Sequence, residues 1–327
     1  MAEISDLATQ ILNGQRRALA RAITLVESTR PDHRAEAVAL LGDLRAASDK
    51  QALRIGLSGT PGVGKSTFTE AFGLQLINAG FKVAVLAVDP SSARSGGSIL
   101  GDKTRMEQLS RQKNAFIRPS PSRTALGGVA RRTREAITVC EAAGFDVILI
   151  ETVGVGQSET MVADMSDIFL LLLAPAGGDE LQGVKRGIME IADMILVNKA
   201  DGELKSTAIR TCADYAGALR LLRKRAQDPS EFPKAMPVSA VTGDGLEEVW
   251  AEIETLISWR RENGFWDKTR SEQASTWFDE EVRQGVLLRL EQDVGIRALR
   301  AELQLKVVAG TLSPESAAQQ VLQALRK

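Results

Sequence analysis

A glycine-rich octapeptide restricts the fold of this chain more than any other feature of its sequence. Residues 59–66 read GTPGVGKS and match the pattern G-x-x-x-x-G-K-[ST]. A short apolar run at residues 53–58 precedes the motif and predicts a buried strand, and the pattern that follows predicts a helix. This strand–loop–helix order is the context in which such a motif forms a phosphate-binding loop, or P-loop.

The octapeptide has the chemistry needed to bind the phosphates of a nucleotide. Its glycines allow backbone N–H groups to face phosphate oxygens, and the start of the helix favours an anion. Lys65 is predicted to reach the β- and γ-phosphates, and the Ser66 hydroxyl is predicted to ligate Mg²⁺. The alternative is a glycine-rich turn without a ligand. The predicted phosphate-binding residues are Gly59, Thr60, Pro61, Gly62, Val63, Gly64, Lys65, Ser66 and Thr67.

Strand-like and helix-like segments alternate through the middle of the chain. Further strands are expected at residues 82–88, 147–150, 168–173, 194–197 and 236–238, with amphipathic helices between them. This alternation predicts the α/β class, with a P-loop NTPase parallel sheet flanked by helices. We expect a helical N-terminal extension (1–50), a GTP-binding α/β domain (51–262) that closes with a helix at 247–261, and a helical C-terminal arm (263–327).

The terminal segments show helical patterns with clear breaks. Residues 29–31 separate the first apolar pattern from a second helix, expected at about residues 34–46. Residues 271–308 form one long charged amphipathic pattern. Ser313, followed by Pro314, is expected to cap a final helix.

The tetrapeptide Asn198-Lys199-Ala200-Asp201 follows the strand expected at 194–197 and indicates a guanine site. The Asp201 carboxylate can accept both the N1–H and the exocyclic amine of guanine. Adenine lacks this donor pair, so the motif favours GTP over ATP. Asn198 can bond the base edge, and the Lys199 stem can pack along the ring. The alternative is a solvated helix start that Asp201 caps.

A second loop supports the guanine site. Ser239, Ala240 and Val241 follow the strand expected at 236–238. GTPases carry a similar S-A loop, in which a backbone N–H, here that of Ala240, meets the guanine oxygen. An ordinary strand-to-helix loop is the alternative.

Two acidic residues end predicted strands. Glu151 follows the apolar run at 147–150, a Walker-B arrangement in which the acid holds Mg²⁺ directly or through water, and the Gly154 N–H can meet the γ-phosphate. Most GTPases have D-x-x-G here, so Glu151 suggests a particular branch. Asp89 ends the strand at 82–88, at the edge where parallel sheets bind ligands, and is placed to act near Mg²⁺. The alternatives are a solvated strand-end glutamate and a turn-forming aspartate before proline.

The composition restricts the functional classes. Basic and acidic residues number 41 and 42, so no global basic field exists to hold a nucleic acid. One histidine and two cysteines without a CxxC pair exclude a His-rich metal site and a disulfide framework, which indicates a cytoplasmic protein. The longest apolar stretch, near residues 168–176, is far shorter than a membrane span, and the N-terminus lacks a secretory pattern. We therefore expect a soluble protein with neither a nucleic-acid nor a membrane partner.

Taken together, these motifs resemble the SIMIBI class of P-loop GTPases, and within it the methylmalonyl-CoA mutase-associated GTPases (the MeaB/ArgK family). The resemblance is carried by residues 89–92, 96–106, 151–159 and 198–201 and covers nearly the whole chain. It implies a GTPase that serves adenosylcobalamin-dependent methylmalonyl-CoA mutase as a chaperone, gating the loading of the intact cofactor and protecting the enzyme from inactivation. It also implies a homodimer formed by the C-terminal arm.

The same resemblance implies roles for three segments. Residues 89–105 would be the first switch, with Asp89 and Asp102 near Mg²⁺, and residues 151–157 the second. Residues 177–186 would form a mobile loop that meets the partner. Position 155 is valine and not the glutamine that orients water in Ras-like enzymes, so intrinsic hydrolysis is expected to be slow. A partner, or Lys185, would then supplement Lys65 and Glu151 in catalysis.

Three other functions compete with this interpretation. A nickel-delivery GTPase of the same metallochaperone branch would need Cys and His ligands, which are scarce here. A protein-targeting GTPase would be expected to carry a methionine-rich domain, whereas the seven methionines are scattered. A P-loop kinase is disfavoured by the guanine motif and by the lack of a recognisable small-molecule site.

Overall fold

The computed structural model describes residues 2–28, 30–88, 106–119, 126–152, 158–175 and 186–325. The chain divides into two compact units, residues 1–270 and residues 271–327. No helix in these described ranges is both long enough and apolar enough to cross a membrane.

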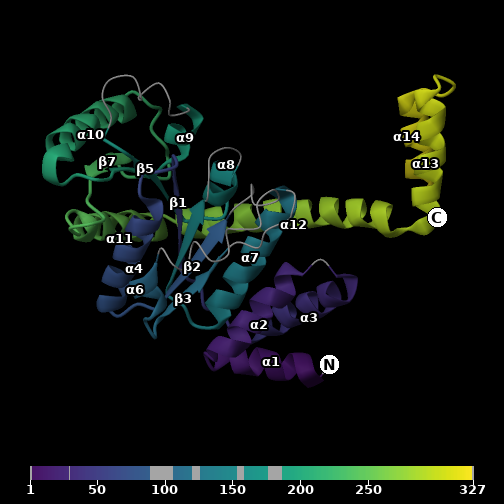
Figure 1. Ribbon diagram of the computed structural model, residues 1–327, viewed down its shortest axis with the longest axis horizontal. Helices are drawn as coiled ribbons and strands as arrows, with labels where there is room; N and C mark the ends of the chain where they lie inside the picture. Colours follow the sequence, from purple (N-terminus) through teal and green to yellow (C-terminus); the bar gives the residue numbers. More distant parts are fainter. Residues whose placement is uncertain are drawn as a thin grey trace. The chain divides into compact units, whose positions relative to one another are not determined.

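The first unit is built on a seven-stranded parallel sheet (Figure 1). The strand order is β3-β2-β4-β1-β5-β6-β7, and each neighbouring pair is parallel. β1 lies between β4 and β5, so the P-loop leaves the centre of the carboxyl edge. The strands are β1 (Leu53–Gly59), β2 (Val83–Val88), β3 (Ala115–Arg118), β4 (Val147–Thr152), β5 (Ile168–Leu173), β6 (Met194–Val197) and β7 (Lys234–Pro237).

Helices cover both faces of the sheet, as the alternating pattern predicts. On one face, α4, α6 and α11 share an apolar core with Ile55 and Leu57 of β1. Gly56 points to the other face, where a Cβ would meet Val162 of α8 at 2.9 Å. α7 and α10 contact β2 and β7, respectively. These helices are α4 (Lys65–Asn78), α6 (Glu107–Ser110), α7 (Leu126–Ala142), α8 (Ser158–Ala163), α9 (Arg186–Ile191), η2 (Gly202–Leu204), α10 (Lys205–Arg220) and α11 (Leu246–Glu262).

The N-terminal extension forms three helices where the sequence predicted two. They are α1 (Ala2–Leu12), α2 (Arg16–Glu27) and α3 (Pro31–Ala47). The extra break falls at Gly14, whose φ of +71° is left-handed and ends the first helix. Figure 1 shows the three helices gathered beside α7, where Arg34 of α3 pairs with Glu135. The extension therefore packs on α7 within the first unit.

The second unit is helical, but the long pattern expected at 271–308 is broken. α12 (Phe265–Gln292) begins in the first unit, and α13 (Val294–Val308) and α14 (Pro314–Ala324) follow. Asp293 separates α12 from α13, and its carboxylate caps α13 by accepting a bond from the Ile296 N–H at 3.0 Å. Ser313 caps α14 in the same way, through the Ser316 N–H at 3.2 Å, which confirms the predicted helix start.

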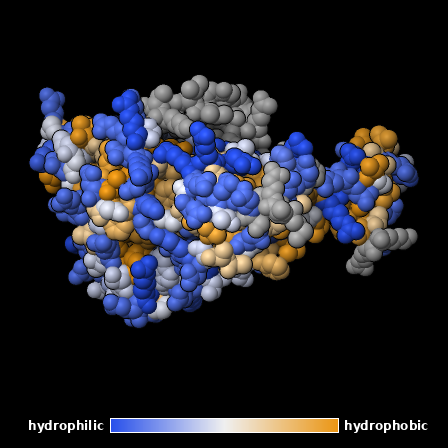
Figure 2. Space-filling view, turned by 90° about the horizontal axis from the view of Figure 1, so that it is seen from below, coloured by the Kyte–Doolittle hydropathy of each residue, from blue (hydrophilic) through white to orange (hydrophobic). Residues whose placement is uncertain are grey.

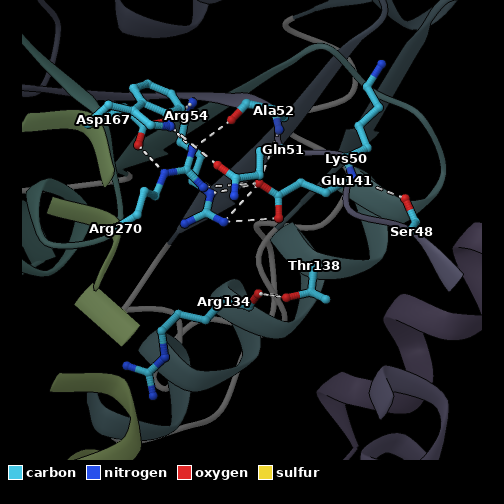
Figure 3. A network of polar contacts seen from close by, with 11 residues as sticks. Ser48, Lys50, Gln51, Ala52, Arg54, Arg134, Thr138, Glu141, Asp167 and Arg270 are labelled. Atoms are coloured by element: carbon cyan, nitrogen blue, oxygen red, sulfur yellow. Dashed lines mark hydrogen bonds and ion pairs between the residues drawn. The ribbon is translucent and has the colours of Figure 1, made fainter. Parts of the chain in front are cut away.

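Figure 3 shows a buried network of ion pairs around Arg54. Arg54 lies near the start of β1, whereas the P-loop follows the end of that strand. The Glu141 carboxylate of α7 accepts bonds from Arg54 Nε and Nη2 at 3.0 and 2.9 Å. Arg270 Nη2 donates to Asp167 at 2.6 Å and to the Ala52 carbonyl at 2.8 Å. Burial lowers the pKa of Arg54, an effect that the charge of Glu141 opposes. The network ties the last residue of the first unit to the sheet, and loss of one buried partner would leave the other charge uncompensated.

Candidate nucleotide-binding site

The P-loop connects β1 to α4 through glycines that no other residue could replace without strain. Gly59, Gly62 and Gly64 have φ values of +147°, +81° and +92°. A Cβ on Gly59 would stand 2.2 Å from the carbonyl oxygen of Leu172 in β5. The predicted strand–loop–helix context is therefore present. Thr60, Pro61 and Thr67 are exposed along the loop, where a ligand can reach them.

The Lys65 side chain folds back over the loop from the first residue of α4. Its Nζ donates to the carbonyl oxygens of Gly59 at 2.6 Å and Thr60 at 3.2 Å. Burial lowers the pKa of Lys65, while the negative charges of Glu151 and Glu159 oppose that change. The ammonium group thus lies within the loop that would surround the phosphates.

Glu151, at the end of β4, faces two hydroxyl groups of α4. Its Oε1 accepts a bond from the Ser66 hydroxyl and its Oε2 one from the Thr69 hydroxyl, both at 2.9 Å. Adjacent ligands of an octahedral Mg²⁺, each roughly 2.0–2.1 Å from the ion, lie about 2.9 Å apart. The Ser66 hydroxyl and the Glu151 carboxylate are oxygen ligands of the kind that Mg²⁺ takes, and they lie close enough together to be neighbouring ligands of one ion. Sequence reasoning missed Thr69, although its position three residues after Ser66 places it on the same helix face.

Asn198 joins three segments of the site and is 2% exposed. Its Nδ2 donates to the Val63 carbonyl of the P-loop at 2.9 Å, and its Oδ1 accepts a bond from the Ala240 N–H at 3.1 Å. Its own N–H donates to the Leu173 carbonyl at 2.8 Å. In this structure Asn198 therefore positions the P-loop against the S-A loop. The contacts predicted between guanine and Asn198 or the Ala240 N–H remain predictions.

Lys199 and Asp201, the other two residues predicted to contact guanine, lie beside the P-loop and the S-A loop. Lys199 has a left-handed φ of +61°, and its Nζ donates to the Gly62 carbonyl at 2.9 Å, so its stem crosses beside the P-loop. The Asp201 carboxylate accepts a bond from the hydroxyl of buried Ser239. Val241, by contrast, is 80% exposed.

An open groove of about 1150 Å³ runs from the P-loop helix to the S-A loop. Thr67, Ala240 and Val241 are among its lining residues. The groove extends along α4 and the start of α11, and Lys65, Ser66 and Asp201 do not line it, so it lies beside the predicted phosphate and guanine contacts and does not contain them. Asp89, Asp102, Gly154 and Lys185, which the sequence also predicts, lie outside the described residues.

Comparison with known proteins agrees with this geometry. The family model described as "Methylmalonyl Co-A mutase-associated GTPase MeaB" matches residues 19–294. A putative GTPase of Caulobacter vibrioides is 51% identical, with 98% of both chains covered. GTPase ArgK of Escherichia coli is 43% identical, with 98% of this chain and 96% of that protein covered.

Two further relatives broaden the comparison. The mitochondrial methylmalonic aciduria type A homolog of Mus musculus is 48% identical, with 99% of this chain and 80% of that protein covered. A crystal structure described as a LAO/AO transport system kinase matches with a TM-score of 0.75 and 36% identity, over 100% of this chain and 99% of that one. The chain is therefore a GTPase that belongs to the MeaB family of methylmalonyl-CoA mutase-associated GTPases.

Proposed function

We propose that this GTPase is a chaperone of adenosylcobalamin-dependent methylmalonyl-CoA mutase, which gates cofactor loading and protects the mutase. The observation that carries the proposal is the family match over residues 19–294, within which the P-loop, Glu151 and the guanine motif lie. The name of the mouse relative, which refers to methylmalonic aciduria, supports the same client. A cytoplasmic location is part of the proposal, and cell fractionation would test it.

The nucleotide is proposed to bind together with Mg²⁺. Ser66 and Glu151 would hold the ion directly or through water, and Asp89 and Asp102 would complete its surroundings. The ion would supply positive charge opposite the negative charge that develops on the phosphates during hydrolysis. Lys65 would leave the loop carbonyls to contact the same phosphates. The Gly154 N–H is proposed to meet the γ-phosphate.

Regulation by a partner is consistent with the catalytic residues. Val155 stands where Ras-like enzymes carry glutamine, so the isolated protein is expected to hydrolyse GTP slowly. The mutase, or Lys185, would supply the catalytic contribution that glutamine makes in Ras-like enzymes. The test is GTP turnover with and without the mutase, which is expected to raise the rate. An unchanged rate would favour the alternative, in which the protein is a GTPase metallochaperone of the same branch that serves another client enzyme.

A kinase activity is a second candidate, because the matched solved structure is described as a kinase. Glu151, Lys65 and the P-loop would also suit phosphoryl transfer to an acceptor. The guanine motif and the GTPase names of the relatives favour hydrolysis. Appearance of phosphate on an acceptor molecule, in place of free inorganic phosphate, would support the kinase.

The C-terminal arm is proposed to form a homodimer. Several apolar side chains in the second unit are exposed, and hydrophobic side chains gather on the α13–α14 part of that unit in Figure 2. The exposed apolar residues include Phe278, Val286 and Leu287 of α12 and Leu305 and Val308 of α13. Light scattering should therefore give twice the chain mass of 35.2 kDa. A mass of one chain at micromolar concentration would contradict the dimer.

A further inference from the structure

The outer face of α10 carries an apolar stripe that no other described part of the first unit covers. Ile209, Ala213 and Gly217 of α10 and Leu221, its C-cap, follow one another at intervals of four residues, and all four are exposed. Ile209 is 53% exposed and Leu221 is 88% exposed. The opposite face of α10 packs on the sheet through buried residues. Those buried residues are Ala208, Thr211, Cys212, Tyr215 and Leu219. We call the exposed set the α10 stripe.

Nothing in the described part of the first unit requires a glycine at position 217. Its φ lies outside the left-handed region, and a Cβ built on it would meet nothing within 4 Å. A glycine inside a helix costs about 0.5–1 kcal/mol relative to alanine. Because position 217 has no side chain, a second helix could approach α10 closely at this point.

The surroundings of the stripe are basic, although the chain as a whole carries a net charge of −1. Residues 203–224 contain five basic and two acidic side chains. Arg210, Arg220, Arg223 and Lys224 are exposed. A second copy of the same surface would bring like charges together, so self-association through this face is disfavoured. The charge instead favours an acidic partner.

Buried ion pairs fix the position of the basic loop at the end of the stripe. Arg225 Nη2 donates to Asp193 at 2.9 Å, and its Nε forms an ion pair with Asp228 at 2.6 Å. Arg260 Nη2 donates to Asp228 at 2.6 Å and also pairs with Asp193. Both aspartates are buried. A surface ordered in advance in this way loses less conformational entropy when a partner binds.

We propose that the α10 stripe docks an amphipathic helix of the client enzyme, whose apolar face contacts the stripe and whose acidic side chains meet Arg220, Arg223 and Lys224. The inference rests on the proposed function, because it takes methylmalonyl-CoA mutase as the client. It adds a contact surface that lies on an outer helix and not in the nucleotide-binding loops.

The test compares Gly217 with Gly42, an exposed helix glycine that lies outside the α10 stripe. Gly217→Gln adds a side chain to the stripe, and Gly42→Gln adds the same side chain to the exposed face of α3, where a Cβ also meets nothing within 4 Å. Neither variant should lower the unfolding temperature or basal GTP turnover, since glutamine is the better helix former. Gly217→Gln should weaken mutase binding, measured by calorimetry with a non-hydrolysable GTP analogue, by about tenfold or more. Gly42→Gln should not.

Charge reversal gives a second readout. Arg220→Glu with Arg223→Glu should slow association with the mutase and reduce its dependence on salt, whereas Arg17→Glu with Arg21→Glu on α2 makes the same charge change elsewhere and should not. If wild type binds the mutase and the Gly217 and Arg220/Arg223 variants bind equally well, the docking surface is refuted while the proposed function stands. If wild type does not bind the mutase, both are refuted.

Discussion

Replacing Asp201 by asparagine should lower the affinity for GTP by about 10²–10⁴-fold and raise that for XTP. The carboxylate is predicted to accept two guanine donors, and each bond to a charged group contributes about 1.5–3 kcal/mol. Asparagine offers one acceptor and one NH₂ donor, which suits the C2 carbonyl of xanthine. The bond from the Ser239 hydroxyl can persist, because the asparagine oxygen also accepts it. Equilibrium binding of both nucleotides to wild type and D201N measures the change.

The opposite shifts of GTP and XTP separate recognition from damage to the fold. A variant that lost affinity for both nucleotides equally would indicate a disturbed site. Unchanged GTP affinity would contradict the assignment of Asp201 to the base and would favour the alternative in which Asp201 only orders the S-A loop through Ser239.

Replacing Lys65 by alanine should lower GTP turnover by about 10²–10³-fold, the cost of removing one donor aimed at developing negative charge. The ammonium group already lies in the P-loop, 2.6 Å from the Gly59 carbonyl oxygen. In the complex it would exchange that partner for phosphate oxygens. Single-turnover hydrolysis at saturating GTP measures the chemical step apart from binding.

Lys113→Ala provides the control for Lys65→Ala. Lys113 is exposed in the turn before β3, so its loss removes the same charge without touching the P-loop. Its turnover should equal that of wild type. A Lys65→Ala variant that retained turnover within about threefold would exclude Lys65 from the catalytic group.

Local patterns in the sequence suffice to predict much of the fold and of the candidate site. The octapeptide fixes where β1 ends and α4 begins, because its glycines need left-handed φ values and its lysine opens a helix. The apolar run before Glu151 is long enough to indicate a buried strand, and in the structure this run forms most of β4. These features depend on residues that are neighbours along the chain, so periodicity and motif context reveal them.

Features that depend on distant residues could not be predicted in this way. β3 was not predicted, because its four residues form too short an apolar pattern to indicate a strand. Its pairing with β2 makes it part of the sheet. Asn198 bonds Val63 and Ala240, which lie 135 and 42 residues away along the chain. The same motif that predicted contact with a base therefore also positions two loops. Only the three-dimensional arrangement shows this second role.

The most direct test of the central claim is GTP turnover by the purified protein, with and without methylmalonyl-CoA mutase, for wild type and Lys65→Ala. If intrinsic hydrolysis is slow and a partner supplies the missing catalytic contribution, the mutase should raise wild-type turnover by about tenfold or more. The Lys65→Ala protein should stay at background in both conditions. Wild-type turnover that is the same with and without the mutase would contradict the proposal that this GTPase acts on that enzyme.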